Sequence, residues 1–266
     1  MRQRPLVLFF VLAYAGGWLV FVPLALLQGS LVWTALATIA PTLAAVITHR
    51  VTTGSYSAFR VIAGWPRALA AGLAGALLMM FAYVVLPGNT ATDPSRLQWS
   101  ALASLSVYNY STLIGGPLGE EPGWRGYALP RLEAALGPVR ATIVLALLWV
   151  GWHLPLFFYP AWVSTPAWIY LLILVGASFI LTFVTNLARF NVLAPIAAHA
   201  AFNTVSGWLA GFFANTRPNV GVPFELVLAL CGLAVSAVLI GATRGLLRYE
   251  ERPTCPPSPK ASVGPP

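Results

Sequence analysis

The chain has 266 residues, of which 58% are hydrophobic and only 8% are charged, and its mean hydropathy is +0.78. A soluble domain carries about 25% charged residues, so this composition excludes an ordinary soluble globular protein and indicates one embedded in a membrane. The net charge of +8 would suit a nucleic-acid-binding protein, but the positions of the charges along this chain favour a bilayer instead.

Eight apolar runs follow one another along the chain. Each is close to the length of about 20 residues that an α-helix needs to cross a bilayer, and several contain Gly or Pro, which membrane helices tolerate. In chain order they cover residues 6–27, 31–48, 68–86, 101–118, 141–158, 167–185, 193–213 and 224–242. The sequence therefore predicts an all-α, polytopic membrane protein with about eight transmembrane helices.

The positions of the basic residues provide a check on this arrangement of spans, because the cytoplasmic loops of membrane proteins carry most of the Lys and Arg. If the N-terminus is cytoplasmic and every run crosses, 13 of the 15 basic residues fall inside and only Arg96 and Arg217 fall outside. The inside set is Arg2, Arg4, Arg50, Arg60, Arg67, Arg125, Arg131, Arg140, Arg189, Arg244, Arg248, Arg252 and Lys260. We therefore expect both termini to be cytoplasmic.

Three segments differ from the spans in composition. The first run, with its basic start and "AYAGG", is also compatible with a cleavable signal peptide, although its apolar character continues to Leu27. Residues 50–67 are basic and aromatic and are predicted to lie on the inner membrane surface. Residues 252–266 are Pro-rich and predict a disordered cytoplasmic tail after a single transmembrane domain, residues 1–251. The two cysteines, Cys231 and Cys255, have no partner at a metal or disulfide spacing.

Five polar residues lie within these apolar runs or just past their ends. Glu120 and Glu121 follow the fourth run, His153 lies in the fifth, and His199 and Asn203 lie in the seventh. An ionisable group inside a membrane costs about 2.5–3.5 kcal/mol on insertion scales, so each one is a candidate functional residue.

The spacing of these residues favours a shared polar pocket. Glu121 and Arg125 are four residues apart, as are Trp149 and His153, and His199 and Asn203, so each pair lies on one helix face. Adjacent side chains on a helix point about 100° apart, so one glutamate can face the pocket while the other pairs with Arg125. A carboxylate can take a proton from water, and a His and an amide can donate to an oxyanion. These are the parts needed to hydrolyse an amide.

Three motifs then resemble a known family. "EEPGWRG" (120–126), "WVGWH" (149–153) and "HAAFN" (199–203) are similar to the EExxxR, FxxxH and HxxxN motifs of the CPBP family of CAAX proteases and bacteriocin-processing proteins. The resemblance spans residues 116–203, within an expected family core of about residues 100–215. It departs from the pattern at Trp149, where the family usually has Phe.

The resemblance implies a glutamic intramembrane endopeptidase, related to the Ras-converting CAAX prenyl endopeptidases. By analogy Glu120 activates the attacking water, His153 helps to hold it, and His199 and Asn203 form the oxyanion site. Glu121, Arg125 and Trp149 would be supporting residues. The implied partners are a peptide or lipidated protein substrate and the bilayer of the plasma (inner) membrane, with no nucleic acid.

Other interpretations stay open at this point. The same buried residues could serve a non-catalytic membrane binding or immunity scaffold, or a proton-coupled transporter. No cofactor is expected, with zinc held by Glu120, His153 and His199 as the alternative; the HExxH pattern of many zinc peptidases is absent.

The depth of Glu120 is a geometric problem. If the fourth helix ends at Leu118, Glu120 lies near the cytoplasmic surface, whereas His153 lies roughly 20 Å beyond Arg140 by helical rise. One solution is a helix that continues past Pro122 to about Leu129 with a kink at the proline. Another is that Pro122 ends the helix.

Overall fold

The computed structural model describes residues 4–29, 33–56, 116–159, 165–214 and 224–250, with a few single positions between 58 and 74. These residues contain helices and no β-strand. The first group consists of α1 (Arg4–Leu27), α2 (Thr34–Thr38) and α3 (Ala40–Thr53). The centre holds α6 (Pro117–Glu121), the π-helical η3 (Pro122–Ala128) and α7 (Leu129–Leu136). The last group holds α8 (Pro138–His153), the 3-10 turn η4 (Leu154–Phe158), α9 (Ala167–Leu187), α10 (Leu193–Ala214) and α11 (Phe224–Ala242).

Five helices in this part of the chain are long and apolar enough to cross a membrane. They are Arg4–Leu27, Thr34–Thr53, Pro138–Phe158, Ala167–Leu187 and Glu225–Ala242. The prediction of an all-helical, polytopic membrane protein is confirmed. The count of eight spans and the orientation stay predictions, because run 68–86, residues 101–115, most of the surface segment 50–67 and the tail 252–266 lie outside the described residues.

The sequence left open whether the fourth helix ends near Leu118 or continues past Pro122, and the structure shows a helix that begins at Pro117 and continues. Gly116 precedes the first turn, and the chain is then helical through α6, η3 and α7 to Leu136. Proline lacks a backbone N–H and its ring crowds the carbonyl four residues earlier, so Pro122 would break a regular α-helix. The chain instead adopts π-helical pairing, in which the Leu129 N–H reaches Trp124 O, five residues back. Pro122 therefore does not end this central helix.

Two glycines fix the central helix against α2 and α3. A Cβ on Gly119 would lie 2.5 Å from Thr38 O, and a Cβ on Gly123 would lie 2.4 Å from the backbone of Pro41. Thr42 Oγ1 also donates a 2.6 Å hydrogen bond to Gly119 O. Small residues one turn apart let two helix backbones approach closely. This contact holds one face of the central helix against α2 and α3.

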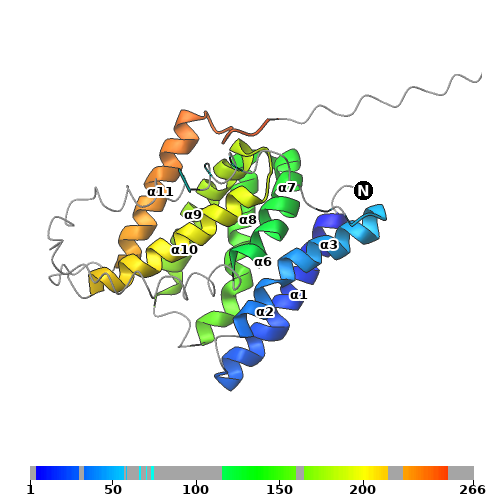
Figure 1. The fold of residues 1–266 in the computed structure, drawn as a ribbon, viewed down its shortest axis with the longest axis horizontal. Coiled ribbons are helices and arrows are strands. Elements are labelled where there is room, and N and C mark those ends of the chain that lie inside the picture. The colour runs from blue at the N-terminus through cyan, green and yellow to red at the C-terminus, as the bar shows by residue number, and fades with distance from the viewer. Residues whose placement is uncertain are drawn as a thin grey trace, which may run out of the picture.

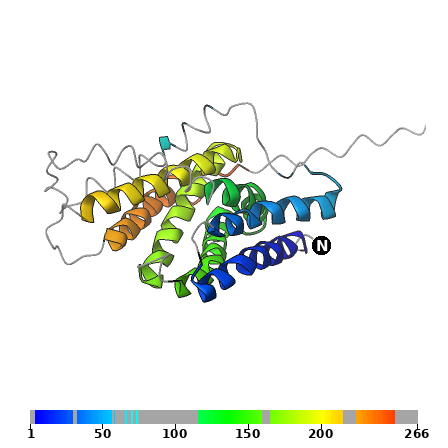
Figure 2. The same cartoon turned by 60° about the horizontal axis from the view of Figure 1, so that its bottom comes forward.

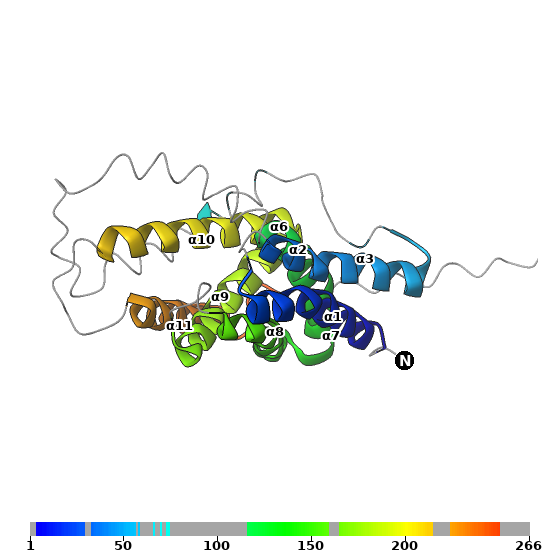
Figure 3. The same cartoon turned by 90° about the horizontal axis from the view of Figure 1, so that it is seen from below.

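The central helix lies between two groups of helices. α1 and α3 run side by side on one side of it, and α9, α10 and α11 lie on the other (Figures 1 and 2). Seen from below, α6 lies between α10 and the α2–α3 pair (Figure 3). Side chains on the face of α6 that does not meet α2 can therefore reach α8, α9 and α10.

One end of the bundle collects most of the arginines among the described residues. The end of α7 is tied to the end of α9 and to the segment after α11, because Asn186 Nδ2 donates to Glu133 Oε1 at 2.8 Å and to Leu247 O at 3.1 Å. α1 begins and α3 ends on this side (Figure 1). Seven of the eight arginines lie at or beside these helix ends; Arg125 is the eighth. The seven are Arg4, Arg50, Arg131, Arg140, Arg189, Arg244 and Arg248.

Candidate active site

Glu121 is the centre of a buried ion cluster that joins two helices, α9 and α10, to the central one. Its Oε1 accepts a 3.0 Å hydrogen bond from Arg125 Nη1 and lies 2.7 Å from His199 Nδ1 on α10. Arg125 Nη2 donates to Ser178 Oγ on α9 at 3.1 Å. Glu121 and Arg125 are fully buried, so their charges depend on each other rather than on water.

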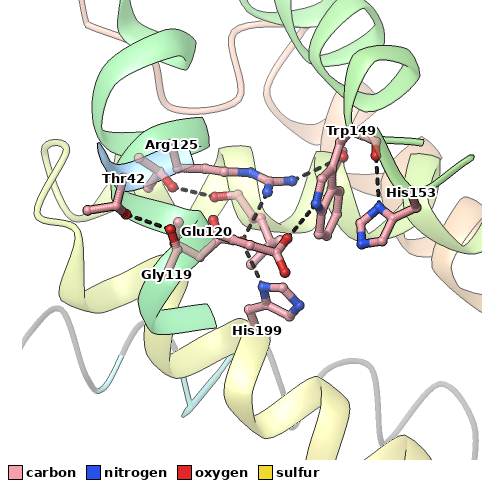
Figure 4. Close-up of polar contacts among 11 residues, drawn as sticks. Thr42, Gly119, Glu120, Arg125, Trp149, His153 and His199 are labelled. Atoms are coloured by element: carbon pink, nitrogen blue, oxygen red, sulfur yellow. Dashed lines mark hydrogen bonds and ion pairs between the residues drawn. The ribbon is translucent and has the colours of Figure 1, made fainter. Parts of the chain in front are cut away.

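Glu120 has different surroundings although it is the next residue. Its Oε2 accepts a 2.6 Å hydrogen bond from the indole N–H of Trp149 on α8, and the side chain is 3% exposed. The Glu120 carboxyl lies between the Trp149 indole and the His199 ring (Figure 4). The Arg125 guanidinium lies 4.2 Å from the centre of the Trp149 ring, so this ring connects the two glutamate environments.

His153 is fixed by its own helix. Its Nδ1 lies 2.8 Å from the carbonyl oxygen of Trp149, one turn earlier. A carbonyl can only accept, so Nδ1 carries the proton, and in the neutral ring Nε2 holds the lone pair. Trp152 and Tyr170 pack edge-on against the ring, at centroid distances of 4.8 and 5.7 Å. In the neutral ring, Nε2 of His153 is therefore a hydrogen-bond acceptor.

The structure brings the predicted motif residues into one region. Glu120, Glu121 and Arg125 come from the central helix, Trp149 and His153 from α8, and His199 from α10. Asn203 follows His199 by one turn of α10 and is partly buried. The predicted pairing of Glu121 with Arg125 is confirmed. The roles assigned to the individual residues stay predictions.

Three further residues contribute, and sequence reasoning did not identify them. Ser178 bonds Arg125, Thr42 bonds the backbone of Gly119, and Tyr170 packs on His153. Each is one hydroxyl residue in an apolar run with no motif around it, so nothing in the sequence separates them from other serines, threonines and tyrosines. The Gly119–Gly123 spacing was a usable signal for close helix packing.

Comparison with known families agrees with the motifs. Residues 100–205 match the family model described as Type II CAAX prenyl endopeptidase Rce1-like. The matched segment resembles the CAAX protease family. The matched CAAX protease segment contains all three motifs, from Glu120 to Asn203. No curated protein matches the chain. The matched family is one of proteases. The five apolar helices among the described residues indicate a multi-pass membrane protein.

The zinc alternative named Glu120, His153 and His199 as ligands. Among the described residues, which include all three, no group of three or more His, Cys, Asp or Glu side chains is placed to hold a metal ion. The Nδ1 atoms of both histidines face protein oxygens, Trp149 O and Glu121 Oε1. Zinc-bound histidines have the same kind of contact at their second ring nitrogen, so the zinc alternative stays a prediction, and no step below uses a metal.

Proposed function

We propose that this protein is an intramembrane endopeptidase that hydrolyses a peptide bond of a membrane-associated or lipidated substrate. One observation carries the proposal. Glu121 is paired with Arg125 and His199, whereas the adjacent Glu120 has a single hydrogen bond, from Trp149, among the described residues. Two side chains hold the Glu121 carboxylate in place, whereas one holds the Glu120 carboxylate. Glu120 is therefore the better base of the two.

In the first step Glu120 takes one proton from a water molecule while the water oxygen attacks the scissile carbonyl carbon. The Nε2 lone pair of His153 accepts a hydrogen bond from the second water hydrogen, which stays on the oxygen, and so orients the water. The carbonyl π bond breaks, and its electron pair becomes the oxyanion of a tetrahedral intermediate.

His199 and Asn203 are the proposed donors to that oxyanion. Glu121 Oε1 holds the His199 ring at Nδ1, which leaves Nε2 of His199 to face the oxyanion. Glu121 is thus a positioning residue for His199.

In the second step the intermediate collapses. The carbonyl reforms, the carbon–nitrogen bond breaks, and Glu120 returns its proton to the leaving amine. The products are a carboxylic acid and an amine, and Glu120 is again ionised. The water contributes its OH to the acid and its proton to the amine.

We also propose that the arginine-rich end of the bundle faces the cytoplasm. α1 begins at this end, and the segment after α11 returns to it (Figure 1), so both termini would be cytoplasmic. In a bacterial cell this corresponds to a multi-pass protein of the plasma membrane.

The test is peptide mapping of membranes that express the wild type, Glu120→Gln or a control. Gln keeps the shape and can still accept from Trp149 Nε1, but it cannot take the proton, so cleavage products should disappear. Glu250→Gln, at an exposed position, should cleave like the wild type. Cleavage that persists in Glu120→Gln would contradict the mechanism. Solute uptake that depends on a proton gradient in proteoliposomes, without cleavage, would favour the transporter; loss of both activities, with retained binding, would favour a scaffold.

A further inference from the structure

Trp149 is the point where this chain departs from the FxxxH pattern, and it also contacts several groups of the site. Its N–H reaches Glu120 Oε2 at 2.6 Å, and its ring lies under Arg125 at 4.2 Å. The His199 ring packs edge-on against it at 5.3 Å. The side chain is 2% exposed, so water has little access to it.

A phenylalanine could reproduce only part of these contacts. It has an aromatic face for Arg125 and an edge for His199, but it has no N–H group. Oε2 of Glu120 would then lose the one hydrogen-bond donor that the described residues supply, in a site that is almost closed to water. The indole N–H is a donor only and takes up no proton in this chemistry. Its role toward Glu120 is therefore to orient the carboxylate.

We propose that the indole N–H of Trp149 is a positioning group for the base, and this inference rests on the function proposed above. It anchors Oε2 of Glu120 to α8, so that the remaining oxygen, Oε1, is turned toward the water. Because α8 also carries His153, one helix sets both the orientation of the base and the second contact of the water. The residue that replaces the family's Phe thus adds a hydrogen bond that the pattern residue cannot make.

The first test compares two tryptophans of the same helix. Trp149→Phe keeps the ring and removes the N–H, and kcat should fall about tenfold with KM little changed, because a misoriented base affects the chemical step more than substrate binding. Trp152→Phe is the matched control: Trp152 is also buried, but its N–H donates to Ala13 O at 3.0 Å and contacts no site oxygen. It should lose a similar amount of thermal stability and much less kcat than Trp149→Phe, because Phe keeps an aromatic ring against His153.

Two results of this comparison would overturn the inference. One is a wild-type kcat in Trp149→Phe. The other is an equal loss of kcat in Trp149→Phe and Trp152→Phe, which would mean that both tryptophans act through packing alone. Replacing Trp149 with benzothienylalanine, which keeps the bicyclic ring and has sulfur in place of N–H, should reproduce the kcat of Trp149→Phe. A benzothienylalanine protein with full activity would contradict the role of the N–H.

A second measurement does not need activity. Ultraviolet resonance Raman spectra contain an indole band whose frequency depends on the hydrogen bond of the N–H. The difference between the wild type and Trp149→Phe should show a strongly hydrogen-bonded indole, and in Glu120→Ala this band should move to the position of a weakly bonded one. A band unaffected by Glu120→Ala would overturn the contact itself. If the band moves but the wild type cleaves nothing, the proposed function fails and the contact stands.

Discussion

The Glu121 carboxylate lies 2.7 Å from the Nδ1 atom of His199, although 78 positions separate the two residues in the chain. Glu121 also binds Arg125, so three ionisable side chains share one buried region. Glu120, one residue earlier, is outside this cluster and bonds Trp149. Two adjacent glutamates thus have different surroundings, and this difference can be tested by stability as well as by activity.

Glu120→Gln and Glu121→Gln should differ in stability. The Glu121 substitution leaves the fully buried Arg125 without its ion-pair partner, and removing one member of a buried pair costs about 3–5 kcal/mol in soluble proteins. The Glu120 substitution preserves the hydrogen bond from Trp149 and should leave the melting temperature near the wild-type value. Thermal unfolding of both variants in detergent measures the difference. Equal melting temperatures would contradict the assignment of Glu121 to the ion cluster.

The Arg125→Lys variant should be impaired although it keeps the positive charge. The guanidinium binds Glu121 and Ser178 with two nitrogens, and its carbon lies 4.2 Å over the Trp149 ring. A lysine amine is a compact charge without a planar face, so it cannot make all three contacts at once. We expect activity to fall at least about tenfold and the melting temperature to decrease. Ser178→Ala removes one of these contacts and should have a smaller effect in both assays; a lysine variant indistinguishable from wild type would refute this explanation.

Gly119→Ala and Gly123→Ala should each disturb the contact between the central helix and α2–α3. The added Cβ atoms would meet the backbones of Thr38 and Pro41 at 2.5 and 2.4 Å, and overpacking of this kind costs about 1–3 kcal/mol. Gly241→Ala is the control, because a Cβ there has no atom within 4 Å. It should be neutral or slightly stabilising, since Ala favours a helix over Gly. The test is the melting temperature of each of the three variants. Equal values would show that the close approach at Gly119 and Gly123 does not contribute to stability.

Glu133 should make stability depend on pH. Burial raises the pKa of Glu133 to about 7, above the ordinary value of 4.5. Between these two values the folded protein holds a proton that the unfolded chain releases, so stability falls as the pH rises from about 4.5 to about 7 and is level above it. The total change is about 3 kcal/mol. Glu133→Gln, which mimics the protonated acid, should lose this dependence. If the melting temperatures of the wild type and of Glu133→Gln change in the same way between pH 5 and 8, the assignment of this pH dependence to Glu133 is contradicted.

Most helix positions were predictable because they depend on local composition. The last run was predicted at residues 224–242 and α11 covers Phe224–Ala242, while the run at 193–213 became α10, Leu193–Ala214. Apolar side chains are favoured in a bilayer wherever the rest of the chain lies, so hydropathy alone marks these segments. The three ordered motifs likewise identified the residues that the fold brings together.

The central helix depended on tertiary contacts. Pro122 is a local signal for a break, and sequence alone left open whether the helix ended or kinked there. The close contact of Gly119 and Gly123 with α2 and α3, together with the π-helical pairing, carries the helix on to Leu136.

The sequence by itself determined that this is a helical membrane protein with glutamate, histidine and asparagine motifs of the CAAX protease type. The tertiary structure decided which glutamate joins Arg125 and His199 and which one receives the Trp149 N–H. The physical reason is the range of the interactions. Hydropathy and motif spacing act within one helix, whereas the surroundings of a buried charge are supplied by neighbouring helices that lie far away in the chain.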